Sequence, residues 1–336
     1  MWHLEFPTSE DLTEYSNLLF NDLKEVIDND IDYRNAFLKN GTIDNDLIQE
    51  LLIAEPERLF LINQDVMSKI IQGYDHNELK EYHSTKSLQN KDAHQIHLYT
   101  KYHDKLNDLV DLVGYKKRIS ENKSRSYKLA KINNRNSCTY CNRQYTLFVI
   151  KDGGTNNNKR IIRPEFDHWF SKELYPLLSL SFYNLIPSCH ICNSSVKGTK
   201  VFSIDTHVHP YLKKHNNLTF NFSRILKPNG WKLIIDRSQL LDSRVENMIS
   251  SFKLDEIYDY HSDLELKDIM DFKMSDNETY LTTLFTTTLI NLPQKTPQDA
   301  YRMLFGVEFM ENKFLDRPFS KMKYDILKKE GLIKLI

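Results

Sequence analysis

All four cysteines of the chain fall into two Cys-x-x-Cys pairs, and this arrangement constrains the fold more than any other feature. The pairs are Cys138 with Cys141 and Cys189 with Cys192. Four thiolates at this spacing meet the tetrahedral preference of a structural zinc ion, which leaves no open coordination position for chemistry. Two disulfides, or four unliganded thiols in a core, are the alternatives. We therefore expect a zinc ion that joins two separate segments of the chain.

The composition predicts a soluble protein rich in helices. The chain has 336 residues, 40% of them hydrophobic, with only 9 glycines and 10 prolines. This apolar content supports a substantial core, and the scarcity of turn formers favours helices over an all-β architecture. The first residues lack the basic start and apolar stretch of a signal peptide, and no apolar run is long enough for a membrane span. We therefore expect a cytoplasmic protein without a membrane partner, and a reduced cytosol suits metal-binding thiolates.

The charge is nearly balanced overall but uneven along the chain. A formal net charge of -1 does not indicate nucleic-acid binding, because phosphate binders usually carry a basic excess. From Lys116 to Arg135, however, lysines and arginines accompany a single acidic residue, Glu121, and the run leads into Cys138. Such a run is either a solvated helix face or a surface that contacts phosphates, and both interpretations stay open.

Apolar periodicity predicts helices on both sides of the cysteine-containing segment. Thr8 or Ser9 can cap the first helix, Pro56 breaks the second, and these stripes are expected to pack in the core. The helical spacing runs over 12–27, 47–62, 96–112, 240–254, 264–274, 280–292 and 301–314. Polar residues from Asn133 to Ser137 interrupt the pattern. We predict three regions: a helical N-terminal region (1–132), a central module (133–212) and a mainly helical C-terminal region (213–336).

The central module changes to an extended pattern. Residues Tyr145–Ile150 and Arg160–Arg163 flank a turn rich in glycine and asparagine, which predicts a hairpin whose second strand ends at His168. A further short strand is expected at Asn184–Ile186, and a helix from Cys192 to Val196 that Gly198 ends. Two strands followed by a helix, placed between helical regions, predict an α+β fold.

The residues around the cysteines resemble the HNH endonucleases, the zinc-knuckle branch of the His-Me finger or ββα-metal nucleases. The resemblance covers a minor part of the chain, but the positions follow one another in the order of the family. They are Cys138 and Cys141, Glu165 to His168, Asn184 to Cys189, Cys192 with Asn193, and Lys197 with Gly198. It implies a small zinc-knuckle ββα-metal module embedded between the two helical regions.

The resemblance also implies roles for four residues. His168 matches the histidine that takes a proton from the attacking water, and Asn184 matches the residue that orients it. Asp167 and Asn193 match ligands of the catalytic divalent cation, and oxygen ligands at both positions favour Mg²⁺ or Mn²⁺. An imidazole with a pKa near about 6.5 suits this proton transfer. An isolated Asp-His pair would more often be a buried histidine beside a capping carboxylate.

Three basic residues near the motif are candidates for contact with nucleic acid. Lys197 follows the last cysteine in the expected helix, and Arg143 and Arg163 flank the predicted hairpin. A lysine late in a short helix is as often exposed to solvent, and the two arginines carry a weaker signal.

Other residues near the motif have plausible structural roles. His207 and His209 alternate as metal ligands on a strand could, but they are similar to a His-Pro-Tyr stretch that follows the motif in defence-associated relatives. We assign them a supporting role. Tyr140 and Tyr145 could stack on a base, but packing in the core is the more common use of such rings.

The residues around the motif are most similar to HNH proteins of bacterial anti-phage defence systems, such as the Septu nuclease subunit that works beside an ATPase. The resemblance implies an endonuclease that cuts DNA, with an ATPase or another defence-system subunit as partner. A nuclease of the same type that cuts RNA such as transfer RNA is one alternative. A zinc-stabilised binding or scaffold protein without activity is the other.

Overall fold

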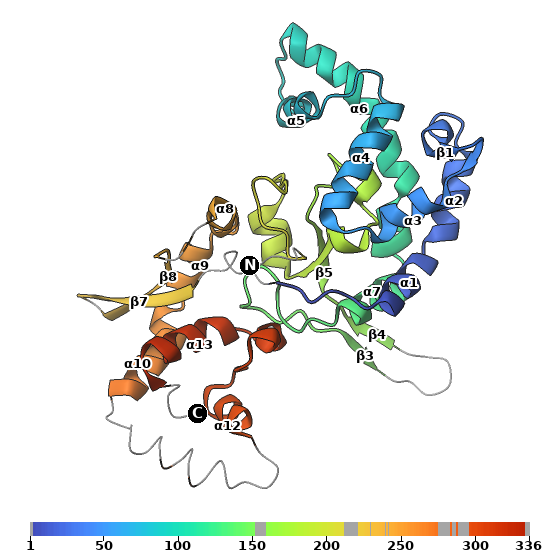
Figure 1. Cartoon of the computed structure of the whole chain (residues 1–336). Helices are drawn as coiled ribbons and strands as arrows, with labels where there is room; N and C mark the ends of the chain where they lie inside the picture. Colours follow the sequence, from blue (N-terminus) through green and yellow to red (C-terminus); the bar gives the residue numbers. More distant parts are fainter. Residues whose placement is uncertain are drawn as a thin grey trace.

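The computed structural model describes residues 3–151, 159–211, 221–228, 230–238, 240, 242–274, 283, 287 and 296–332. Helices dominate these residues, and short antiparallel strand pairs lie between them (Figure 1). The predicted mixture of helices and sheet is thus confirmed. In the described part of the chain, no helix combines the length and the apolar character needed to cross a bilayer.

The N-terminal region consists of helices joined by short connections. They are α1 (Ser9–Asn17), α2 (Phe20–Asn29), α3 (Asn45–Ile53), α4 (Pro56–Ile70), α5 (His76–Thr85), α6 (Ala93–Val113) and α7 (Lys123–Asn133). Two shorter pieces complete it: the 3₁₀ turn η1 (Arg34–Phe37) with the two-residue strands β1 (Leu38–Lys39) and β2 (Thr42–Ile43), and the π-helical turn η2 (Lys116–Ser120).

Local sequence signals account for the ends of these helices. Thr8 caps α1 through a capping box with Asp11, and Pro56 occupies the first turn of α4. The helix expected over 12–27 is instead two helices, because the chain turns at Leu19, whose side chain is completely buried. Ile96, predicted to pack in the core, is 54% exposed.

The central module contains two strand pairs and a helical turn. Strand β3 (Val149–Lys151) pairs with β4 (Lys159–Ile162), β5 (Glu165–His168) pairs with β6 (Leu185–Ser188), and the π-helical η5 (Ile191–Lys197) ends at Gly198. Two 3₁₀ turns, η3 (Pro176–Leu178) and η4 (Phe182–Asn184), lie between β5 and β6.

The predicted hairpin exists but is shorter than expected. Its second strand does not continue to His168, because Pro164 separates β4 from β5 and has no N–H for a ladder hydrogen bond. Residues Glu165–His168 therefore form a strand of their own that pairs with β6. The turn predicted between β3 and β4 lies outside the described residues.

The C-terminal region combines a hairpin with helices. Strands β7 (Asn221–Lys227) and β8 (Gly230–Asp236) pair antiparallel, although the sequence pattern had not predicted them. The helical elements are α8 (Ser243–Ser251), α9 (Leu254–Asp259), η6 (Ser262–Leu266), α10 (Lys267–Met274), α12 (Pro297–Phe305), η8 (Glu311–Asp316) and α13 (Ser320–Lys329). The helix predicted over 280–292 falls almost entirely outside the described residues.

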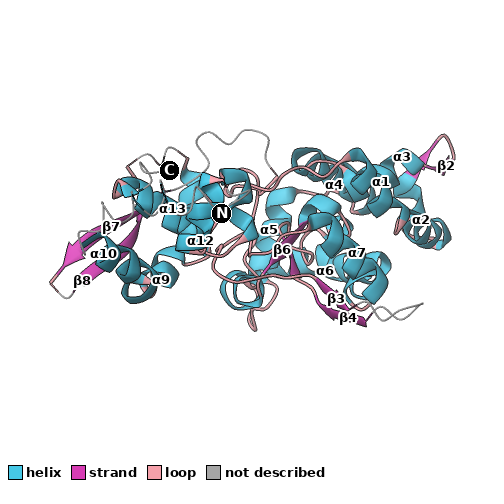
Figure 2. Cartoon of the chain, turned by 90° about the horizontal axis from the view of Figure 1, so that it is seen from below, coloured by secondary structure: helices cyan, strands magenta, loops and turns pink. Residues whose placement is uncertain are grey.

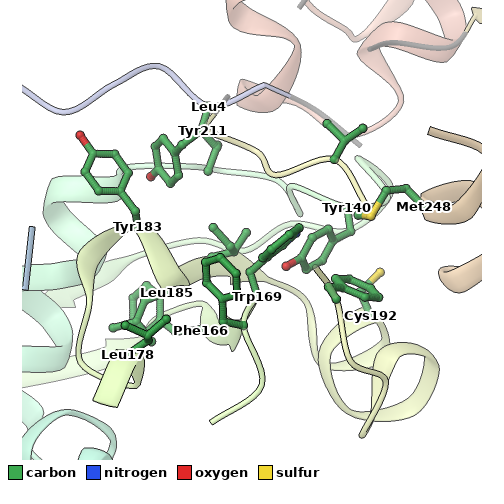
Figure 3. Packing of buried hydrophobic residues seen from close by; sticks show 14 of the residues in the cluster. Leu4, Tyr140, Phe166, Trp169, Leu178, Tyr183, Leu185, Cys192, Tyr211 and Met248 are labelled. Carbon is green, nitrogen blue, oxygen red and sulfur yellow. The ribbon is translucent and has the colours of Figure 1, made fainter. Parts of the chain in front are cut away.

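Buried residues from all three regions form one apolar cluster. Figure 2 shows β6 between the N-terminal helices and the C-terminal part of the chain, and Figure 3 shows residues from the central module packed near Trp169. Hydrogen bonds also cross the predicted boundaries. The Ser137 N–H donates to the Leu315 carbonyl oxygen at 2.9 Å, and the Ser137 hydroxyl donates to the same oxygen at 2.8 Å. The boundaries at 132/133 and 212/213 stay predictions.

Candidate zinc centre and active site

The four cysteines converge on one point. The Sγ atoms of Cys138, Cys141, Cys189 and Cys192 all lie within 4.8 Å of one another, and all four side chains are buried. Four sulfurs around zinc at about 2.3 Å would be separated by about 3.8 Å, so the cluster fits a tetrahedral thiolate site with small adjustments. All four are free thiols, which excludes the disulfide alternative in this structure.

Tight turns bring each pair of cysteines together. The Asn142 N–H donates to the Cys138 carbonyl oxygen at 2.8 Å, and Asn142 has a positive φ of 46° that closes the turn. In the second pair the Cys192 N–H donates to the Cys189 sulfur at 3.5 Å. An N–H directed at a sulfur stabilises the thiolate form, which is the form that binds metal.

The four thiols influence one another electrostatically. Hydrogen bonds from the Cys138 thiol lower the pKa of Cys141 and of Cys189, whereas burial raises the pKa of Cys138. Two of the sulfurs therefore favour the thiolate form before any cation is considered. The residues fit a structural Zn²⁺, whose charge would draw the remaining protons from the cluster.

His168 lies at the end of β5, which pairs with the strand that precedes Cys189. Its Nε2 is 3.1 Å from the Ser179 carbonyl oxygen, and a carbonyl can only accept, so Nε2 carries the proton. Burial lowers the pKa of His168 to about 3, and the ring is therefore neutral with its lone pair on Nδ1. The Tyr115 ring meets the imidazole edge to face at 4.3 Å between centroids. His168 thus has one orientation and one tautomer.

Asn184 is completely buried, and among the described residues its side chain makes no hydrogen bond to His168. Its amide accepts from the Phe170 N–H at 2.6 Å and donates to the carbonyl oxygens of Phe170 and Leu178 at 3.1 and 2.9 Å. These bonds fix the loop that carries Ser179, the acceptor of the His168 proton. The expected orientation of His168 by Asn184 is therefore indirect in this structure.

Asp167 is held on both carboxylate oxygens. The Tyr140 hydroxyl donates to Oδ2 at 2.6 Å, and the Lys197 ammonium donates to Oδ1 at 2.9 Å. The two side chains of the ion pair are only 4% and 3% exposed. Lys197 is therefore not exposed to solvent, which was the alternative left open by the sequence, and its contact with phosphate stays a prediction. Tyr140 is fully buried against Phe252, which confirms core packing for this ring.

A second carboxylate, Glu165, lies on the same strand. Because side chains alternate along a strand, Glu165 and Asp167 share one face of β5. Glu165 Oε2 accepts from the Asn193 side-chain amide at 2.8 Å, and Oε1 is 2.8 Å from Nδ1 of His190. This places Asn193, at the start of η5, beside the carboxylates of β5.

These residues line a common cleft of about 430 Å³. Its walls come from β5, from η5, from the loop after His168 and from the N-terminal η2 segment. The lining residues are Tyr115, Ser120, Arg163, Glu165, Phe166, Asp167, His168, Ser171, Lys172, Glu173, Asn193, Ser194, Lys197, Gly198 and Thr199. The cleft thus brings together five of the predicted site residues: Arg163, Asp167, His168, Asn193 and Lys197. Asn184 does not line the cleft and supports the loop behind it.

The basic residues have more varied positions than expected. Arg163 lines the cleft and donates to the Ser120 carbonyl oxygen at 3.2 Å, whereas Arg143 is absent from the cleft lining among the described residues. In the run from Lys116 to Arg135, several cations pair with acidic residues of the N-terminal region. These pairs are Arg125 with Asp22, Lys128 with Glu14, Arg135 with Glu5 and Lys116 with Glu121.

His207 and His209 have structural positions. His207 stacks on Phe202 with 4.1 Å between ring centroids, and His209 is buried against Trp169 at 4.5 Å. Neither lines the cleft in the described part of the chain, which agrees with the supporting role assigned to them. Tyr145 is 57% exposed, and its stacking on a base stays a prediction.

Three residues of the site had no role assigned from the sequence, although Glu165 stood within the motif. Tyr115 and Ser179 contact His168 from distant parts of the chain, and no local signal identifies either. Glu165 could have been found, because it lies two positions before Asp167 on a predicted strand and therefore on the same face.

Comparison of the chain with protein-family models, with curated proteins and with solved structures found no match.

Proposed function

We propose that the chain is a metal-dependent endonuclease of the HNH type that hydrolyses phosphodiester bonds of DNA. The observation that carries this proposal is the state of His168. Its Nε2–H donates to the Ser179 carbonyl oxygen and its pKa is lowered to about 3 by burial, so Nδ1 keeps a lone pair at the cleft. A general base must be unprotonated and held in position, and His168 meets both conditions. Its pKa of about 3 lies below the value of about 6.5 expected from the sequence, so His168 is a weaker base in this structure than predicted.

In this proposal the residues of the cleft have different catalytic roles. His168 takes the proton of the attacking water at Nδ1. Arg163 and Lys172 bring positive charge to the cleft, and burial raises the pKa of Tyr115 to about 12, so that its hydroxyl stays protonated and can donate to a phosphate oxygen. Ser179 and Asn184 keep the imidazole in place during proton transfer.

The cleft also offers the oxygen donors that a catalytic cation needs. Asp167 and Asn193 line it, Glu165 lies beside Asn193, and carboxylate and amide oxygens are the ligands that Mg²⁺ and Mn²⁺ prefer. When bound, such a cation would neutralise charge on the phosphoryl oxygens and assist the leaving oxygen. The donor set fits such a cation once the Lys197 ammonium is displaced from Asp167.

The distribution of charge favours a role for a partner, because it predicts weak affinity of the chain alone for nucleic acid. The net charge is -1, and the ion pairs of residues 116–135 reduce the charge that phosphates would meet. Nucleic-acid affinity depends largely on such charges. We therefore propose recruitment by an ATPase or another subunit of a bacterial anti-phage system. The cytoplasm, where thiols stay reduced, is the compartment that suits the cysteine cluster.

The test is cleavage by the purified full-length protein, loaded with zinc, in Mg²⁺ or Mn²⁺. Supercoiled plasmid and transfer RNA are incubated in parallel with wild type, with His168→Ala and with His97→Ala, an exposed histidine outside the cleft. We expect plasmid cleavage by wild type and His97→Ala, and a loss of about 10² to 10⁴ in rate for His168→Ala.

Each other outcome selects a different function. Cleavage of transfer RNA alone would replace DNA by RNA as substrate. Cleavage that His168→Ala retains in full would exclude His168 as the base and point to a contaminating nuclease. A zinc-loaded protein that cuts neither substrate, alone or with its candidate ATPase partner, would leave the binding or scaffold role.

A further inference from the structure

We infer that Lys197 occupies the cation position at Asp167 and thereby keeps the affinity of the cleft for divalent cations low. The inference rests on the proposed function, because it concerns the regulation of the same site. It differs from the sequence-based expectation, in which Lys197 contacted phosphate and Asp167 was free to bind metal.

The geometry gives Lys197 three contacts at once. Its Nζ donates to Asp167 Oδ1 at 2.9 Å and to the His168 carbonyl oxygen at 2.6 Å, and it lies 5.0 Å from the centre of the Phe202 ring. An ammonium that contacts a carboxylate, a carbonyl and an aromatic face is surrounded by the groups that stabilise a buried cation. The side chain is 3% exposed, so water contributes little to its solvation.

The other carboxylate oxygen is also engaged. Oδ2 accepts from the hydroxyl of Tyr140, which lies between Cys138 and Cys141 in the zinc knuckle. Asp167 is therefore neutralised by Lys197 and oriented by Tyr140. A divalent cation that coordinates Asp167 would sit within a few ångströms of the Lys197 charge, and like charges at that distance in a poorly hydrated site repel strongly.

This arrangement predicts competition. A divalent cation binds at Asp167 only when Lys197 moves away, and a phosphate oxygen in the cleft would be the natural new partner for the ammonium. Without nucleic acid, the wild-type protein should therefore hold Mg²⁺ or Mn²⁺ weakly, and removal of the Lys197 charge should strengthen that binding.

The test is the affinity of the zinc-loaded, full-length protein for Mn²⁺ alone, measured by the electron paramagnetic resonance signal of free Mn²⁺. Lys197→Met removes the positive charge. If this variant folds poorly, Lys197→Gln also removes the charge but keeps an N–H donor for the His168 carbonyl oxygen. We expect either variant to bind Mn²⁺ at least about tenfold more tightly than wild type. Mn²⁺ should also raise the Tm of the variant more than that of wild type, because it replaces the lost counter-charge.

The chain offers a matched control in a second buried lysine–aspartate pair. Lys321 Nζ is 2.6 Å from Asp325 Oδ1, and both residues are buried. Lys321→Met should lower Tm as Lys197→Met does, but without a gain in Mn²⁺ affinity. The double variant Asp167→Asn with Lys197→Met should lose the gain that Lys197→Met provides.

The inference is overturned if both Lys197 variants bind Mn²⁺ no more tightly than wild type, if the double variant keeps the gain, or if Lys321→Met shows the same gain. The readout does not need turnover, so it separates this inference from the proposed function. A gain in Mn²⁺ affinity in a protein that cleaves nothing would support the cation site and reject the nuclease. His168-dependent cleavage without the gain would support the nuclease and reject the role of Lys197.

Discussion

Burial determines the protonation state of His168 and of His207 and His209, which lie outside the cleft. It lowers the pKa of His168 to about 3, of His207 to about 4 and of His209 to about 3. All three rings are therefore neutral near neutral pH. For His168 this is the state that accepts a proton from water. For the other two it is the state that packs against Phe202 and Trp169 without an unpaired buried charge.

Protonation of His209 links the stability of the fold to pH. Its pKa is about 3 in the folded chain and 6.5 when unperturbed. As the pH falls through this window, the unfolded state binds a proton that the folded state does not bind. The free energy of unfolding should therefore decrease by about 1.4 kcal/mol per pH unit from this residue, whereas above the unfolded pKa the contribution stays constant.

The variant His209→Asn removes this titration and keeps an acceptor for the Tyr211 N–H, which Nδ1 of His209 accepts at 3.1 Å. Urea unfolding between about pH 7.5 and about pH 5 should give a shallower loss of stability for the variant than for wild type. Slopes are compared instead of absolute stabilities, so the packing that the substitution removes cancels. Equal slopes would show that His209 does not contribute to acid sensitivity.

At the scale of elements, the β5–β6 pair and η5 are too short to be stable by themselves. Strands β5 and β6 have 4 residues each, and η5 has 7. Short strand pairs of this kind need support from other elements. Zinc bound by the cysteines would connect the turn at Cys138 to η5 and so fix both sides of the β5–β6 pair.

Removal of the metal should therefore loosen this module first. After treatment with a zinc chelator, we expect hydrogen exchange to accelerate over 138–146 and 185–198, while α4 and α6 keep their protection. Structural zinc contributes on the order of 10 kcal/mol to small zinc folds, so the loss of protection should be large. Added Zn²⁺ should restore protection and added Mg²⁺ should not. Unchanged exchange in both segments would show that the thiols support the module without metal.

Elements with strong local signals were predictable, and those defined by distant partners were not. The caps at Thr8 and Pro56 and the glycine after η5 mark helix ends in the sequence. The order of β5, β6 and η5 followed from the motif. The break at Pro164 and the turn signal Pro228-Asn229-Gly230 of the missed β7–β8 hairpin were present in the sequence but were given too little weight.

The residues of the site likewise include some that the sequence predicted and some that it could not predict. Spacing predicted that the cysteines would cluster, and the structure brings them together. The burial of Lys197 against Asp167 could not be predicted, because helical spacing does not reveal which face of a short helix meets the strand. The contacts of Tyr115 and Ser179 with His168 depend on tertiary packing, which one sequence does not encode in any local pattern.

At the scale of the whole molecule, the C-terminal region supports the turn that carries the first cysteine pair. Asn142 follows Cys141 directly, and its side-chain amide donates to the Ser137 hydroxyl and to the Phe314 carbonyl at 2.8 Å each, and to the Arg317 carbonyl at 3.2 Å. The Phe319 N–H donates to the Asn142 carbonyl oxygen at 2.6 Å. The side chain and backbone of Asn142 thus join the first cysteine pair to η8 and to the residues that precede α13.

The substitution Asn142→Ala should therefore destabilise the turn that carries Cys138 and Cys141. It removes the donor of the buried Phe314 carbonyl oxygen, whereas the Arg317 carbonyl keeps the Ser320 hydroxyl as donor, and it places alanine at a positive φ of 46°. Together these effects should lower the free energy of unfolding by about 2 to 4 kcal/mol. A chromogenic chelator should also remove zinc faster from the variant than from wild type, because the turn that carries Cys138 and Cys141 loses its support.

Asn40→Ala is the control for backbone strain. Asn40 has a similar φ of 52° but is exposed in the turn between β1 and β2. Its substitution should cost about 1 kcal/mol and leave zinc release unchanged. If Asn142→Ala lost no more stability than Asn40→Ala and released zinc at the wild-type rate, the contacts of Phe314 and Arg317 would not support the zinc centre. The C-terminal region would then be bound to the knuckle without stabilising it.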